Sequence, residues 1–178
     1  MPYIITPKYG NITDAKVDFT VNASNTRLIL GSGVSMAFKR HCGIELQKEM
    51  DTIINKYGEL SHGDVVATST CKEQNFRYIL HAAVMNYTKK VTSKNPTSKT
   101  IIDILNNIDA YLEWFIKQHQ ISKVSLALPL LGCGVGRLKK EVVLQLYKEH
   151  FSKNFTYTCN VEIYGYSKED FELIKQFF

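Results

Sequence analysis

Two glycine-bearing segments have the residue types that bind phosphate groups. The first opens after Leu30, and the second after Leu131. Glycine lets backbone N–H groups approach phosphate oxygens because no Cβ atom stands in the way, and a helix N-terminus adds a favourable dipole. Two such loops at one edge of a sheet could hold the two sides of a diphosphate. Their sequences are Gly31-Ser32-Gly33-Val34 and Gly132-Cys133-Gly134-Val135-Gly136.

The side chains near these loops offer little for acid–base chemistry. Asn22 and Asn25 precede the first loop, and Ser35 follows it. A general base needs a suitable pKa and position, which a serine alone does not provide. His81, on a predicted strand, could donate a proton, although a core histidine with a backbone partner is the more common arrangement. We interpret Cys133 as a small residue in a tight loop rather than a nucleophile, because no His or Asp lies near it in sequence.

The first loop also imitates a dinucleotide-binding fingerprint. Gly31 and Gly33, followed by Ala37, match its spacing, and such a protein would be an NAD-dependent oxidoreductase. That fold needs a second strand that ends in an acid about 20 residues further on. Residues Arg40–Tyr57 have the pattern of a helix instead. The oxidoreductase is therefore the weaker alternative.

Short apolar runs alternate with longer amphipathic stretches. Six runs rich in β-branched or aromatic residues predict strands: Tyr3–Thr6, Phe19–Ala23, Val65–Ser69, Tyr78–Val84, Val124–Leu130 and Val161–Tyr166. The stretches with helical spacing predict helices: two within Val34–Lys56, divided at Gly43, then Thr100–Gln118, Lys140–Phe151 and Lys168–Phe177. This alternation predicts an α/β fold around a largely parallel sheet. Such sheets bind ligands beyond the carboxyl ends of their strands, where both glycine loops are expected.

Two further predictions concern the segment before the long helix and the tryptophan within that helix. The segment Met85–Lys99 is polar and carries four lysines and Pro96, so we expect an exposed loop. Trp114 is the single tryptophan, and we expect it among the core positions of the long helix.

Composition excludes several classes of protein. The chain has 178 residues, of which 44% are hydrophobic and 22% charged, so disordered, collagen-like and coiled-coil classes do not fit. No apolar run approaches the roughly 18 residues that span a bilayer, and the N-terminus has no signal-peptide pattern. We expect one domain over residues 1–178, a monomer in the cytoplasm. The four cysteines, which are widely separated, predict reduced thiols without a disulfide framework: Cys42, Cys71, Cys133 and Cys159.

The net charge and the spacing of the Cys and His residues indicate which partners and metals to expect. The net charge of +5 mildly favours an anionic ligand but is too small to indicate nucleic-acid binding by itself. The sequence has no Cys-x-x-Cys pair and no histidines at the spacing typical of zinc ligands. We therefore expect neither a metal nor a cofactor.

The order of four short motifs resembles the macrodomain family, which binds ADP-ribose. The motifs span most of the chain: Gly10-Asn11-Ile12-Thr13, Val21-Asn22-Ala23-Ser24-Asn25, Gly31-Ser32-Gly33-Val34 and Leu128-Pro129-Leu130-Leu131-Gly132-Cys133-Gly134. The resemblance implies a three-layer α/β/α sandwich with a mixed, mostly parallel six-stranded sheet. It also implies an ADP-ribose cleft at the edge of that sheet.

By the same resemblance, each motif has a role in binding. Asn11 and Ile12 would contact the adenine, beside a stacking ring at Tyr164 or, failing that, Tyr166. Asn25 would hydrogen-bond the distal ribose. Asn22 and Leu131 would also belong to the ADP-ribose site. The two glycine loops would surround the diphosphate with Gly31, Ser32, Gly33, Val34, Gly132, Cys133, Gly134, Val135 and Gly136.

Three positions depart from the family pattern. Asn11 replaces the acid that recognises adenine, and an amide oxygen accepts a hydrogen bond without charge assistance. Ser35 and Gly136 stand where two branches of the family have a catalytic acid. Two functions therefore stay open. The protein could hydrolyse ADP-ribose from modified proteins, nucleic acid or O-acetyl-ADP-ribose, with Asn25 and Ser35 as candidate catalytic residues, or it could be a reader module that only binds.

Overall fold

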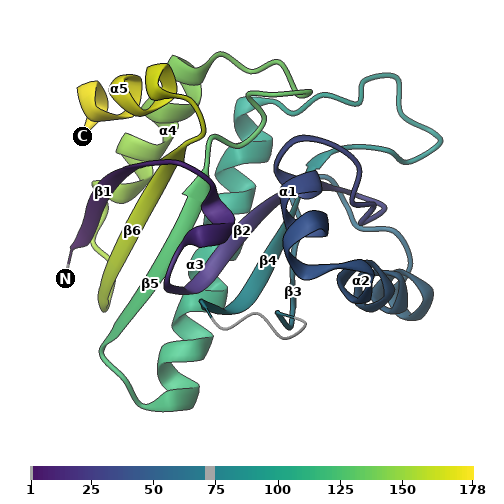
Figure 1. The fold of residues 1–178 in the computed structure, drawn as a ribbon, viewed down its shortest axis with the longest axis horizontal. Coiled ribbons are helices and arrows are strands. Elements are labelled where there is room, and N and C mark those ends of the chain that lie inside the picture. Colours follow the sequence, from purple (N-terminus) through teal and green to yellow (C-terminus); the bar gives the residue numbers. More distant parts are fainter. Residues whose placement is uncertain (1, 71–74) are drawn as a thin grey trace.

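The computed structural model describes residues 2–70 and 75–178, in which six strands form one mixed sheet (Figure 1). The strand order is β1-β6-β5-β2-β4-β3. Neighbouring strands are parallel except β3 and β4, which are antiparallel. The predicted strands and the mostly parallel sheet are thus confirmed. Their bounds are β1 Tyr3–Tyr9, β2 Val17–Asn25, β3 Val65–Thr68, β4 Phe76–Met85, β5 Lys123–Pro129 and β6 Thr158–Gly165.

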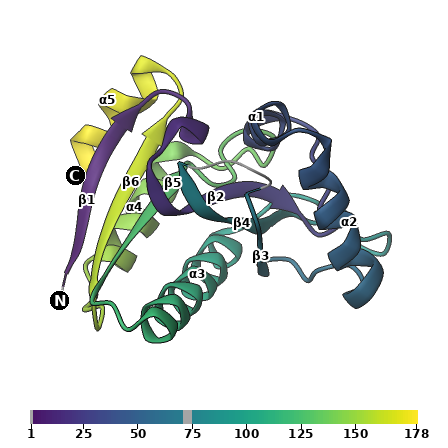
Figure 2. The same ribbon diagram turned by 60° about the horizontal axis from the view of Figure 1, so that its bottom comes forward.

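Five α-helices cover the two faces of the sheet among these described residues. They are α1 Gly33–Cys42, α2 Ile44–Tyr57, α3 Ser98–His119, α4 Lys140–Phe151 and α5 Lys168–Phe177. Figure 2 shows α1 on one side of the sheet and α3 on the other. The α/β/α sandwich is confirmed, and Gly43, with φ of 76°, divides α1 from α2 as expected. A short 3-10 helix, η1 (Ile12–Asp14), was not predicted.

The position of α2 removes the basis for the dinucleotide-binding alternative. Residues 40–57 form the end of α1 and the whole of α2, where that fold would need a second strand. The first loop therefore has the glycine spacing of a dinucleotide-binding fingerprint but lacks the second strand that would carry its acidic residue.

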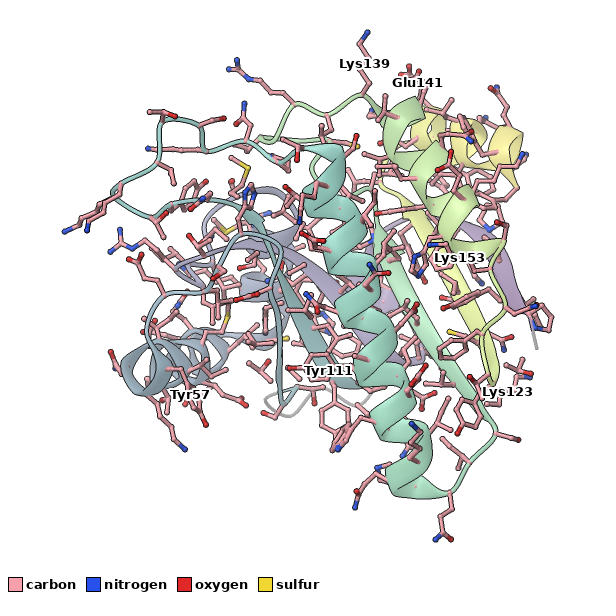
Figure 3. All side chains as sticks on the ribbon, turned by 180° about the vertical axis from the view of Figure 1, so that it is seen from behind. Tyr57, Tyr111, Lys123, Lys139, Glu141 and Lys153 are labelled. Atoms are coloured by element: carbon pink, nitrogen blue, oxygen red, sulfur yellow. The ribbon has the colours of Figure 1, made fainter. Side chains whose placement is uncertain are left out.

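Each face of the sheet has its own hydrophobic cluster. The cluster on the α3 side is the larger, and α3 contributes the apolar stripe expected from its spacing, including Ile101, Ile104 and Leu112. Figure 3 shows α3 crossing the back of the sheet beside α4. The expectation for Trp114 is wrong: its side chain is half exposed, because it lies two positions after Leu112 and so outside the stripe. It meets Tyr78 edge-on instead.

The segment between β4 and α3 is mostly exposed, as expected, but one residue is not. Pro96 is buried, and its ring lies against the second glycine loop. A backbone hydrogen bond from Asn86 N–H to the Lys94 carbonyl closes the intervening turn. Across residues 2–70 and 75–178, no helix combines the length and apolar character that crossing a bilayer requires.

Candidate functional site

Two hollows meet at the N-terminus of α1. The smaller has a volume of about 170 Å³ and the larger about 660 Å³. Gly33 and Val34 line both of them, so together they form one cleft that passes the first turn of the helix. We refer to them as the small hollow and the large hollow.

The small hollow lies at the carboxyl edge of the parallel strands. Asn25 ends β2, Met85 ends β4 and Leu130 follows β5, and all three line the hollow. Both glycine loops close over it, as the position of each loop after a strand predicted.

The start of α1 provides donors at the point where the hollows meet. Ser32 is the N-cap residue, but its side chain makes no capping hydrogen bond, and the first turn contains no acid. The first N–H groups of a helix have no partner within the helix, and its dipole favours a negative charge there. Gly33 has φ of +57°, and a Cβ at this position would meet no atom within 4 Å. The junction is thus open and suited to an anion.

Asn25 holds the chain that leads from β2 to this helix. Its Oδ1 accepts hydrogen bonds from the N–H groups of Arg27 and Ile29, and its Nδ2 donates to the Ile29 carbonyl. Most of its hydrogen-bonding capacity therefore shapes the loop, and one amide hydrogen is left for the hollow.

A buried polar chain supports the floor of the cleft. The Ser35 hydroxyl lies 3.0 Å from both Asn22 Oδ1 and the Ala23 carbonyl oxygen. Asn22 Nδ2 is 3.0 Å from His81 Nδ1, and His81 Nε2 is 2.8 Å from Thr68 Oγ1. Because Asn22 donates to Nδ1, the neutral imidazole carries its hydrogen on Nε2. Burial lowers the pKa of His81 to about 3, in agreement with this neutral form. The prediction that His81 has a backbone hydrogen-bond partner is wrong, since both of its partners are side chains.

The second glycine loop is packed so closely that Gly136 has no room for a side chain. A Cβ there would lie 2.7 Å from the Gly132 carbonyl oxygen and 2.8 Å from Pro96 Cγ. The same proline approaches Gly132, whose φ is +76°. The acid that one branch of the family has at the position of Gly136 is therefore excluded here by Pro96.

The large hollow combines apolar and polar walls. Ile12 and Tyr164 line it together with Asn11, and Arg40 of α1 lines it as well. The Tyr164 hydroxyl donates to Glu162, and burial, with this carboxylate, raises the pKa of Tyr164. Asn11 Oδ1 already accepts from the N–H and the hydroxyl of Thr13.

Three residues assigned to binding lie outside both hollows. Asn22 is part of the buried chain, and Leu131 points into the core. Cys133 is half-buried against the same core, and burial raises the pKa of its thiol to about 12, which argues against a nucleophile. Cys71 lies outside the described residues. In the described ranges, no three His, Cys, Asp or Glu side chains come close enough together to hold a metal ion.

Sequence reasoning missed residues that strand ends, η1 and α1 bring into the cleft. They are Ala23, Ser24, Ile29, Val84, Met85, Tyr87 and Leu130 in the small hollow, and Gly10, Thr13, Asp14, Met36, Ala37, Arg40, His41 and Pro129 in the large one. Ser24 is notable because its buried hydroxyl has no hydrogen-bond partner in the described part of the chain. Its position one residue before Asn25 was the available signal.

Comparison with known proteins identifies relatives of this architecture. The Macro domain family model matches residues 21–147. A Saccharolobus solfataricus protein is 28% identical over 176 residues, which is 95% of this chain and 89% of that protein. A mutant of the Oceanobacillus iheyensis macrodomain, solved with ADPR, has a TM-score of 0.71 at 22% identity, covering 97% of this chain and 89% of that one. The Trypanosoma brucei macrodomain in complex with ADP-ribose has a TM-score of 0.76 at 18% identity, covering 97% and 68%.

Replacing Gly136 with alanine should destabilise the protein. The new Cβ would overlap the Gly132 carbonyl oxygen and the Pro96 ring, and overpacking of this kind costs about 2 kcal/mol. Thermal unfolding should show a Tm lower by about 4–8 °C. Gly134→Ala is the matched control, since nothing lies within 4 Å of a Cβ there. Equal Tm values for the two variants would contradict the close packing of Pro96 and the Gly132 carbonyl oxygen against Gly136.

The neutral state of His81 should make stability depend on pH. Below about pH 6.5 the unfolded chain binds a proton that the folded chain excludes until about pH 3, so the free energy of unfolding should fall as the pH falls through this window. The slope is about 1.4 kcal/mol per pH unit. Urea unfolding at pH 7, 6 and 5 should show this loss in the wild type and a weaker one in His81→Gln. The exposed His119→Gln should keep the wild-type slope.

Proposed function

Because this chain belongs to the Macro domain family, we propose that it binds ADP-ribose, either free or as an ADP-ribosyl group on another molecule. The observation that carries this proposal is the continuous cleft that bends past the N-terminus of α1. The large hollow, with Ile12 and Tyr164, suits a nucleoside. The N–H groups at Gly33 and Val34 suit the diphosphate, and the small hollow suits the distal ribose.

The related structures support the same ligand. The Trypanosoma brucei and Oceanobacillus iheyensis macrodomains were solved with ADP-ribose, and both share the fold of this chain. These structures share only the fold with this chain. The groups that would contact the ligand are those of the residues that line the cleft here.

The small hollow favours a reader over an enzyme. Among the described residues that line it, none is Asp, Glu, His, Lys or Arg, so no lining side chain is suited to act as a general base. Ser35 donates its hydrogen to neighbours in the floor of the cleft.

Hydrolysis is the second candidate function. It would need a water held by the ligand's diphosphate and by the backbone N–H groups of the two glycine loops, aimed at the anomeric carbon of the distal ribose. The remaining Asn25 amide hydrogen is the side-chain group that could orient that ribose. Modified protein, modified nucleic acid and O-acetyl-ADP-ribose are the candidate substrates.

A charge at Gly33 should abolish binding. Isothermal titration of the wild type should give a micromolar Kd for ADP-ribose, and weaker binding of AMP and NAD. Gly33→Glu places a carboxylate at the junction of the hollows, where it repels the diphosphate. Gly33→Gln adds the same bulk and the same positive-φ strain without the charge, so it should bind at least about tenfold more tightly than Gly33→Glu.

Two results would count against this proposal. Equal affinities of the Glu and Gln variants would show that the junction does not hold an anion. If the wild type bound none of the three nucleotides, the cleft would serve another ligand.

Turnover distinguishes the enzyme from the reader. We expect a mono-ADP-ribosylated protein, a modified oligonucleotide and O-acetyl-ADP-ribose to bind with enzyme in excess and to remain intact. Release of ADP-ribose would establish the second candidate function. In that case the rate should stay flat between about pH 6 and 8, because no lining side chain of the small hollow titrates in that range. A bell-shaped profile would point to a base outside this hollow.

A further inference from the structure

The edge of the large hollow offers a nucleobase a donor at Asn11 and an acceptor at Asp14. Both residues belong to the turn around η1, and both line the hollow. Their different hydrogen-bonding states determine what each can offer.

Asn11 has no acceptor left for a ligand. The atom 3.0 Å from the Thr13 backbone N–H must be the amide oxygen, because a backbone N–H only donates. That oxygen also accepts from the Thr13 hydroxyl at 2.8 Å. An amide has a single oxygen, whereas a carboxylate would keep a second one free. Asn11 therefore presents only its N–H₂ group, a donor, and a donor does not bind the amino group of adenine.

Asp14 supplies the missing acceptor three residues later. Its carboxylate is exposed and, within the described part of the chain, forms no hydrogen bond or ion pair. Its backbone N–H donates to the Asn11 carbonyl, which fixes the turn that carries both side chains. Asp14 and Tyr164 both line the hollow, and the negative charge of Asp14 adds to the rise in the pKa of Tyr164.

We propose that Asp14 is the residue that selects adenine over 6-oxopurines, by accepting a hydrogen bond from the exocyclic amino group. This inference rests on the proposed binding of ADP-ribose. Adenine carries an amino donor where hypoxanthine carries a carbonyl acceptor, so a carboxylate attracts the first base and repels the second. A charge-assisted hydrogen bond discriminates more strongly than a neutral one.

The test compares ADP-ribose with inosine diphosphate ribose, in which a carbonyl replaces the amino group. Isothermal titration of the wild type should show a preference for ADP-ribose. Asp14→Ala should reduce the ratio of the two affinities about tenfold, and Asp14→Asn, which keeps a neutral acceptor, should give an intermediate ratio. Adding Asn11→Asp to Asp14→Ala should restore the preference, because the new carboxylate can cap Thr13 with one oxygen and bind the base with the other.

Glu172→Gln on α5 is the control for a lost surface charge and should leave the ratio unchanged. If Asp14→Ala binds both ligands with the wild-type ratio, Asp14 does not read the base and the inference is overturned. If the wild type binds neither ligand, the proposed function itself fails, and the inference fails with it.

Discussion

The placement of one helix start determines the candidate site. The first turn of α1 must open at the carboxyl edge of the sheet for its N–H groups to face a ligand. Side chains from three directions hold it there. Asn25 ties the loop after β2, and Ser35 anchors the helix to β2 from within. Gln47 of α2 accepts from the Leu30 N–H and donates to the Leu28 carbonyl, which fixes the loop from outside. The loop therefore needs little rearrangement to receive a diphosphate, and such preorganisation lowers the entropy cost of binding.

The opposite wall of the cleft is fixed in the same way. The Tyr147 hydroxyl, fully buried on α4, donates to the Pro129 carbonyl and accepts from the Leu131 N–H at the point where β5 turns into the second glycine loop. Pro96 then closes the loop from the segment before α3. Each glycine loop is thus supported by a polar side chain that lines neither hollow: the half-buried Gln47 for the first loop and the fully buried Tyr147 for the second. Mutations at Gln47 or Tyr147 would alter the cleft without removing any group that contacts its occupant.

The sequence predicted those features that have a local signal. Alternating apolar runs marked all six strands, and the glycine loops marked the sheet edge. The contacts between distant segments had no such signal: nothing near Gly136 indicated Pro96, and nothing near Asn22 indicated His81. The 3-10 turn at Ile12 was missed because its signal is one capping residue, Asn11, whose side-chain oxygen accepts from the N–H and the hydroxyl of Thr13. Trp114 was misplaced because being on an amphipathic helix does not fix which face a residue occupies.

The three departures from the family pattern share a physical explanation. Each position has a contact within this chain that limits the chemistry available to it. At Gly136 the Pro96 ring leaves no space for a carboxylate. At Ser35 the buried hydroxyl is used by β2, and an acid in its place would lose solvation beside the neutral His81 chain. At Asn11 the only amide oxygen caps the turn. A role carried over by sequence position alone would give these three residues chemical groups that already form contacts within the fold. The Asp14 carboxylate, which none of the motifs includes, has no such contact in the described part of the chain.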